Sequence, residues 1–204
     1  MVVVHTAGLS QSLAPGCDDI ATNAHPRIEP GSTVAVVVPA NVPTAFRNGL
    51  TSAINQLNGA VNGIRFEQAA TEPDEGGSIN LTYGGANVGG EMGYYKGSKG
   101  SNGYLRAGQM HIYPDTIGCR DDSSICLDPS NQAAYQAAIE FVFLHELLHA
   151  LGADHSTKSN VMYKSFWGVN NTDNANPNLD CVKQRMRTLL GLNGSPPPPY
   201  TCYS

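Results

Sequence analysis

The first half of the chain combines β-branched runs with one segment of helical periodicity. Residues 32–39 include the run Thr-Val-Ala-Val-Val-Val, which is typical of a strand buried on both faces. Apolar residues then recur every three or four positions and predict an amphipathic helix of about four turns that ends at Gly59. They are Phe46, Leu50, Ile54 and Leu57. Strands are predicted next at 63–68 and 78–83, and this strand–helix–strand order predicts a right-handed crossover.

The middle of the chain changes character. Residues 84–103 are rich in glycine and show no period, so we interpret them as a long surface loop. Residues 104–113 predict a strand, which Pro114 stops.

A long helix of about six turns is predicted to begin at Pro129, with Asp128 as its N-cap, and to end at Leu151. Gly152 follows as the residue that ends the helix in a left-handed conformation. The apolar stripe of this helix consists of Ala134, Ala138, Phe141, Leu144, Leu148 and Leu151.

These elements predict one α/β domain with a parallel or mixed sheet. Residues 1–31 hold little periodicity and are interpreted as an extended segment that wraps the domain. The domain itself covers 32–192 and includes a last helix at about 178–190. Residues 193–204 form a proline-rich tail that cannot continue as helix or strand interior.

Composition narrows the function classes. The chain has 204 residues, of which 41 % are hydrophobic and 14 % charged, against roughly 25 % charged in an average domain. A net charge of −5 with only 12 Lys and Arg argues against a nucleic-acid partner. No apolar run approaches the roughly 20 residues that span a bilayer. The first residues lack an export signal, and we expect one to have been removed from a secreted, monomeric protein.

The five cysteines favour an oxidising compartment, since none has a C-x-x-C spacing. Cys119 and Cys126 bracket a short polar loop that a disulfide would close. Among Cys17, Cys181 and Cys202 one further bridge is expected, which leaves one thiol over.

The predicted long helix carries a metal-binding pattern. His145 and His149 are four residues apart, so both imidazoles project from one face and suit a single tetrahedral zinc ion. Glu146 projects beside the metal and suits the role of general base. Gly152 permits a chain reversal that presents His155 as a third ligand. Three neutral nitrogens leave a fourth position open, which is typical of a hydrolytic zinc site.

The pattern His145-Glu146-x-x-His149-x-x-Gly152-x-x-His155 resembles the metzincin signature at every fixed position. Met162 is similar to the methionine of the metzincin methionine turn, and Met162-Tyr163 is most similar to the matrixin branch. The resemblance implies a metzincin-type domain with a twisted mixed sheet, an active-site helix, a methionine turn and a C-terminal helix. It also implies one catalytic zinc and a polypeptide substrate. Zinc and Glu146 would activate water for attack on a peptide carbonyl.

Several alternatives stay open at this stage. The resemblance implies that the substrate lies along an edge strand, which we expect at 104–113. A binding module that keeps the metal without catalysis, or a zinc amidase, would carry the same residues. Residues 1–31 would cover the cleft if the chain is a zymogen, with Cys17 either bridged to the C-terminal region, as we favour, or capping the zinc. Calcium binding is left open, and His5, His25 and His111 are interpreted as ordinary packing or surface residues.

Overall fold

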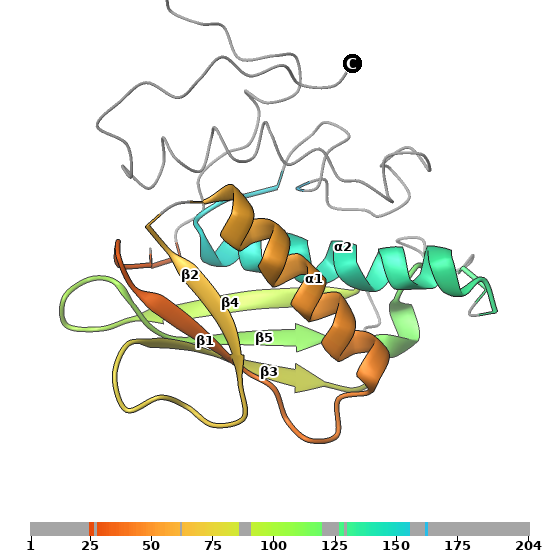
Figure 1. Ribbon diagram of the computed structural model, residues 1–204, viewed down its shortest axis with the longest axis horizontal. Helices are drawn as coiled ribbons and strands as arrows, with labels where there is room; N and C mark the ends of the chain where they lie inside the picture. Colours follow the sequence, from red (N-terminus) through yellow and green to blue (C-terminus); the bar gives the residue numbers. More distant parts are fainter. Residues whose placement is uncertain are drawn as a thin grey trace, which may run out of the picture.

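The computed structural model describes residues 25–26, 28–61, 63–85, 91–119, 127–128, 130–155 and 162. Its elements follow the order of strand and helix expected for an α/β domain (Figure 1). In chain order they are β1 (Thr33–Val37), α1 (Thr44–Ala60), β2 (Arg65–Ala69), β3 (Gly77–Tyr83), β4 (Gly93–Lys99), β5 (Leu105–Ile112), the 3-10 turn η1 (Pro114–Thr116) and α2 (Gln132–Ala150).

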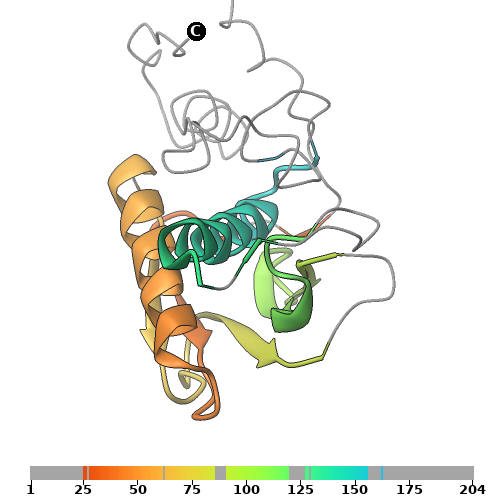
Figure 2. The same cartoon turned by 90° about the vertical axis from the view of Figure 1, so that its right-hand side faces the viewer.

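The five described strands form one mixed sheet in the order β2-β1-β3-β5-β4. Strands β2, β1, β3 and β5 are mutually parallel, and β4 pairs antiparallel with β5. Helix α1 connects the parallel neighbours β1 and β2, as the strand–helix–strand order predicts. Helices α1 and α2 pack side by side on the same face of the sheet (Figures 1 and 2).

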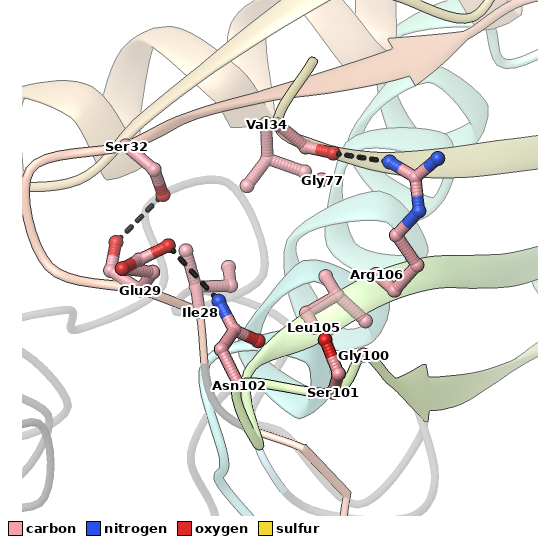
Figure 3. A pocket seen from close by; sticks show the side chains of 11 residues that line it. Ile28, Glu29, Ser32, Val34, Gly77, Gly100, Ser101, Asn102, Leu105 and Arg106 are labelled. Atoms are coloured by element: carbon pink, nitrogen blue, oxygen red, sulfur yellow. Dashed lines mark hydrogen bonds between the residues drawn. The ribbon is translucent and has the colours of Figure 1, made fainter. Parts of the chain in front are cut away.

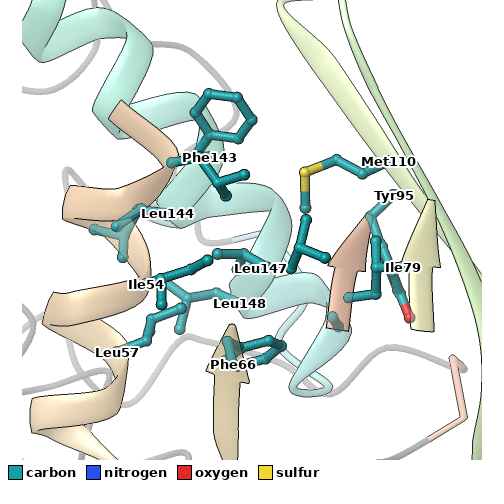
Figure 4. Close-up of a cluster of buried hydrophobic side chains, with 14 of the residues drawn as sticks. Ile54, Leu57, Phe66, Ile79, Tyr95, Met110, Phe143, Leu144, Leu147 and Leu148 are labelled. Atoms are coloured by element: carbon teal, nitrogen blue, oxygen red, sulfur yellow. The ribbon is translucent and has the colours of Figure 1, made fainter. Parts of the chain in front are cut away.

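The core fills the space between the two helices and the sheet (Figure 4). The predicted stripe of α1 is buried there throughout, because its residues recur on the face that meets α2 and the sheet. Helix α2 is enclosed on more than one side from Ala138 onward, so its burial is wider than the predicted stripe. The largest fully buried side chains belong to both helices and to strands β3 and β5: Phe143, Leu144, Leu147, Leu148, Ile139, Leu50, Leu57, Ile79, Met110 and Ile112, together with Ile28.

The prediction of a surface loop over 84–103 is wrong for its second half, because Gly93–Lys99 forms strand β4. Only Tyr95 of this strand is buried, at 6 % exposure. The strand forms because β5 pairs with it from Gly93, opposite Ile112, to Lys99, opposite Leu105, with one register shift between Ser98 and Lys99.

The position of β4 also corrects the predicted edge. The sequence favoured 104–113 as an edge strand, but β5 lies between β3 and β4 and is hydrogen-bonded on both sides. The outermost strand on this side of the described sheet is therefore β4.

Helix α2 begins three residues later than predicted. Its N-cap is Asn131, whose side-chain oxygen accepts a hydrogen bond from the Ala134 N–H at 3.3 Å. Asp128 instead accepts from the Ser130 N–H at 2.8 Å, within a turn that precedes the helix.

Several predictions lie outside the described residues. They concern the last helix, the proline-rich tail, most of 1–31 and the partners of Cys119, which is itself buried. The described part of the N-terminal segment includes Ile28, which is buried in the core. Among the described residues, no helix combines the length and hydrophobicity needed to cross a membrane.

Candidate metal centre

The C-terminal end of α2 closes in a Schellman motif that reverses the chain. The Ala153 N–H donates to the Leu148 carbonyl and the Gly152 N–H to the His149 carbonyl, both at 3.0 Å. Gly152 has φ +98°, a left-handed conformation that costs glycine little. The predicted left-handed end of the helix at Gly152 is therefore observed, and the reversal returns His155 toward the helix face of His145.

The three predicted histidines converge on one point. The Nε2 atom of His145 lies 3.1 Å from Nε2 of His149 and 3.2 Å from Nε2 of His155. A tetrahedral zinc ion with Zn–N bonds of about 2.0–2.1 Å separates its nitrogen ligands by about 3.3 Å. The spacing of the three nitrogens therefore fits a divalent ion of this size, and these residues could hold a metal.

The surroundings of His149 determine the tautomer and the protonation state of its ring, and both suit metal binding. Its Nδ1 lies 2.8 Å from the Ala153 carbonyl oxygen, which only accepts, so the proton resides on Nδ1 and the lone pair on Nε2 faces the other histidines. Burial lowers the pKa of His149 to about 4, the Ala153 hydrogen bond opposes this shift, and nearby His155 adds to it. The imidazole is thus neutral at pH 7, as a metal ligand must be.

Glu146 lies beside the histidines on the same helix and is buried, at 3 % exposure. Its Oε2 atom has no hydrogen-bond partner among the described residues. Burial raises the pKa of this carboxyl to about 8, and the nearby Glu91 carboxylate adds to the rise. A buried carboxyl oxygen without a hydrogen-bond partner costs stability, which is typical of a functional site.

Strand β4 runs against the same part of α2. A Cβ atom built on Gly93 would lie 3.2 Å from Glu146 Oε1, so the backbone of β4 adjoins this carboxyl group. The Tyr113 N–H donates to the Met92 carbonyl at 2.9 Å, and Gly93 stands opposite Ile112. In this register the N–H and C=O of Gly93, Tyr95 and Gly97 point away from β5, toward the outer side of the sheet.

Three further residues were considered in the sequence analysis: Met162, Tyr163 and His111. Met162 is fully buried within the hydrophobic core, whereas Tyr163 lies outside the described residues. His111 packs as predicted: its Nδ1 lies 2.7 Å from Thr82 Oγ1, its Nε2 lies 3.0 Å from the Gly84 carbonyl, and its ring stacks on Tyr94.

Sequence reasoning missed two residues that adjoin the site. Gly93 gave no signal within a glycine-rich stretch. His25 was interpreted as ordinary, but its ring meets Tyr95 edge-on at 5.2 Å between centroids, and its charge contributes to the lowered pKa of His149.

A separate pocket of about 400 Å³ lies at the other end of β5, between the N-terminal segment and the β4–β5 turn (Figure 3). Its polar groups already bond to one another: the Arg106 guanidinium donates to the Gly76 carbonyl at 3.2 Å, and the Asn102 amide donates to the Glu29 carboxylate at 3.4 Å. None of the predicted site residues lines it.

Comparisons with known proteins add little to this geometry. No family model matches the chain, and no curated protein matches it. Among solved structures, the chain is similar to one described as the GM1 bound form of the ECX AB5 holotoxin, with 13 % identity and a TM-score of 0.40. The match covers 73 % of this chain and 66 % of that chain, slightly less than two thirds. A likeness this distant carries no argument about function.

Proposed function

We propose that the protein is a secreted, zinc-dependent endopeptidase with a metzincin-type domain. The observation that carries the proposal is the convergence of the three Nε2 atoms beside the buried carboxyl of Glu146. Three histidine nitrogens with an open fourth position are the donor set of catalytic rather than structural zinc. The sequence pattern from His145 to His155, with Met162 buried in the core, supports the metzincin assignment.

Each residue then has a defined task. His145, His149 and His155 would hold the ion, with the Ala153 carbonyl fixing the orientation of the His149 ring. A zinc ion in this place supplies Lewis acidity, which activates water and polarises a carbonyl group. Glu146 accepts the proton of the attacking water and passes it to the leaving amine nitrogen.

The substrate class follows from the edge strand. An extended polypeptide would pair with the outward N–H and C=O groups of Gly93 and Tyr95, in the first part of β4. This strand takes the place that the sequence assigned to residues 104–113. Main-chain pairing brings a peptide carbonyl beside Glu146, because Gly93 adjoins that side chain.

The decisive experiment combines metal analysis with cleavage assays on casein and a quenched peptide library. Glu146→Gln should keep one zinc per chain and lose activity by about 10²–10⁴-fold, the range of general-base catalysis. The matched control is Glu140→Gln on the same helix, where glutamine retains an oxygen that accepts from Gln56; its activity should be unchanged.

Other outcomes would redirect the assignment. Full activity in Glu146→Gln would remove Glu146 from the mechanism. A wild-type chain that binds zinc and cleaves no peptide would be a binding module, and hydrolysis confined to small amides would indicate an amidase. A chain that does not bind zinc would contradict the whole proposal.

A further inference from the structure

Gly93 stands where β4 meets the helix that carries the proposed general base. A Cβ atom at this position would lie 2.9 Å from the His111 carbonyl oxygen, 3.1 Å from Val142 Cγ2 and 3.2 Å from Glu146 Oε1. Real Cβ atoms essentially never come as close as the first of these, and the other two are tighter than most Cβ contacts. Strand β5 and two successive turns of α2 thus surround the space that a side chain would need.

The main-chain groups of Gly93 point toward the outer edge of the sheet. Because Gly93 and Ile112 form a non-hydrogen-bonded pair, the N–H and C=O of Gly93 are directed away from β5. The position of the absent Cβ of Gly93 therefore adjoins Glu146, while the backbone pairing groups of the same residue point to the outer edge of the sheet. Because Gly93 has no side chain, the backbone of β4 can lie close to the carboxyl group of Glu146.

The geometry points to Gly93 as a positioning residue that fixes the separation between the substrate-pairing edge of β4 and the carboxyl group of Glu146. This inference rests on the proposed function, because it assigns a role within that reaction. The missing methyl lets the strand lie directly against α2, so that a paired peptide carbonyl and the base are held at reacting distance. A displacement of about 1 Å in such an arrangement costs roughly 10²-fold in rate.

A purely structural role for Gly93 makes a different prediction, and Gly97 provides the matched control. Gly97 lies further along the same strand, outside the residues proposed to pair with the peptide, and its Cβ would also meet a neighbour, at 2.6 Å from the Tyr95 hydroxyl oxygen. It does not adjoin Glu146. If only the shape of β4 matters, Gly93→Ala and Gly97→Ala should impair the protein alike.

The test measures kcat and KM for one peptide substrate in the zinc-loaded chain. Gly93→Ala should lower kcat by about 10–100-fold with KM changed less than about threefold, since the main-chain pairing groups remain. Gly97→Ala should leave kcat within about twofold. Adding Val142→Ala to Gly93→Ala removes one of the close contacts and should restore part of kcat, judged against Val142→Ala alone. That pair also serves if Gly93→Ala alone does not fold.

A second measurement is independent of activity. In the zinc-free chain at one fixed pH, the ¹³C resonance of the Glu146 carboxyl carbon should shift in Gly93→Ala and not in Gly97→Ala. An unmoved resonance, or equal losses of kcat in both variants, would overturn the inference. An inactive wild-type chain would contradict the proposed function but not this inference. The ¹³C resonance of the Glu146 carboxyl carbon would still show whether Gly93 positions that side chain.

Discussion

The packing of α1 on α2 gives a stability prediction whose sign opposes helix propensity. Gly49 lies in α1 and is buried against α2. In an exposed helix, Gly→Ala gains about 1 kcal/mol. At Gly49, however, the new Cβ would lie 2.6 Å from Ile139 Cγ2 and 3.5 Å from the backbone nitrogen of Glu140. Ile139 is fully buried, so it has no free space to yield into.

Gly59 is the matched control within the same helix. It is exposed, and a Cβ there would meet nothing within 4 Å. Gly59→Ala should therefore stabilise the chain by up to about 1 kcal/mol through propensity alone. Forcing a methyl into the packed interface at Gly49 costs about 1–3 kcal/mol. The difference between the two variants isolates that cost, because both share the propensity gain.

Urea unfolding followed by far-ultraviolet circular dichroism measures this difference on the metal-free chain, since bound metal would add its own stability. Gly49→Ala should lie about 1–3 kcal/mol below Gly59→Ala at an unchanged m-value. Combining Gly49→Ala with Ile139→Ala should cost less than the sum of the two single changes, because the clash is removed. Equal stability of Gly49→Ala and Gly59→Ala would refute the close contact between the helices.

Two further predictions concern the metal centre. Raising the pH of the metal-free chain from about 6.5 to 8 should lower its stability by about 1.5 kcal/mol, because the folded state holds a proton on Glu146, with its pKa of about 8, that the unfolded state has lost. The depressed pKa of His149 acts with opposite sign and mainly below its ordinary value of 6.5, so it opposes this change by only about 0.4 kcal/mol. Glu146→Gln should abolish the fall in stability in urea titrations. Gly152→Ala should lower stability by about 1–3 kcal/mol through its positive φ and also weaken zinc binding in chelator competition, because it disturbs the approach of His155. Gly31→Ala has a similar φ of +85° and equal free space, so it should lose stability and keep its zinc affinity; parallel losses of affinity would contradict the role of Gly152.

The convergence of the three histidines could be predicted from the sequence because its geometry is local. Helical periodicity alone fixes His145, Glu146 and His149 on neighbouring directions of α2, and one left-handed glycine determines where the chain returns. No long-range contact is needed to bring the third histidine within range. The start of α2 was less accessible, since Asp128 and Asn131 are both suitable caps and only the surrounding contacts decide between them.

Strand β4 could not be predicted, and the reason lies in the side chains that its inner face lacks. Alternation of apolar and polar residues predicts a strand when the inward positions are apolar. The inward positions of β4 are Gly93, Tyr95 and Gly97, so two of the three carry only hydrogen. The Tyr95 ring occupies the space beside Gly97 and its partner Gly108, where added Cβ atoms would approach it to within 2.6 Å and 2.9 Å.

The glycines that conceal β4 in the sequence are therefore what allow it to pack. At Gly97 the missing side chain accommodates Tyr95, and at Gly93 it lets the strand lie against the carboxyl of Glu146. A strand with ordinary apolar alternation would be easy to recognise, but its inward side chains would hold the edge of the sheet away from the histidines and from Glu146. Strand β4, which has the weakest hydrophobic pattern, is thus the strand whose backbone adjoins the proposed base. A glycine-rich stretch that precedes a recognised strand can therefore be an edge strand that lines a site.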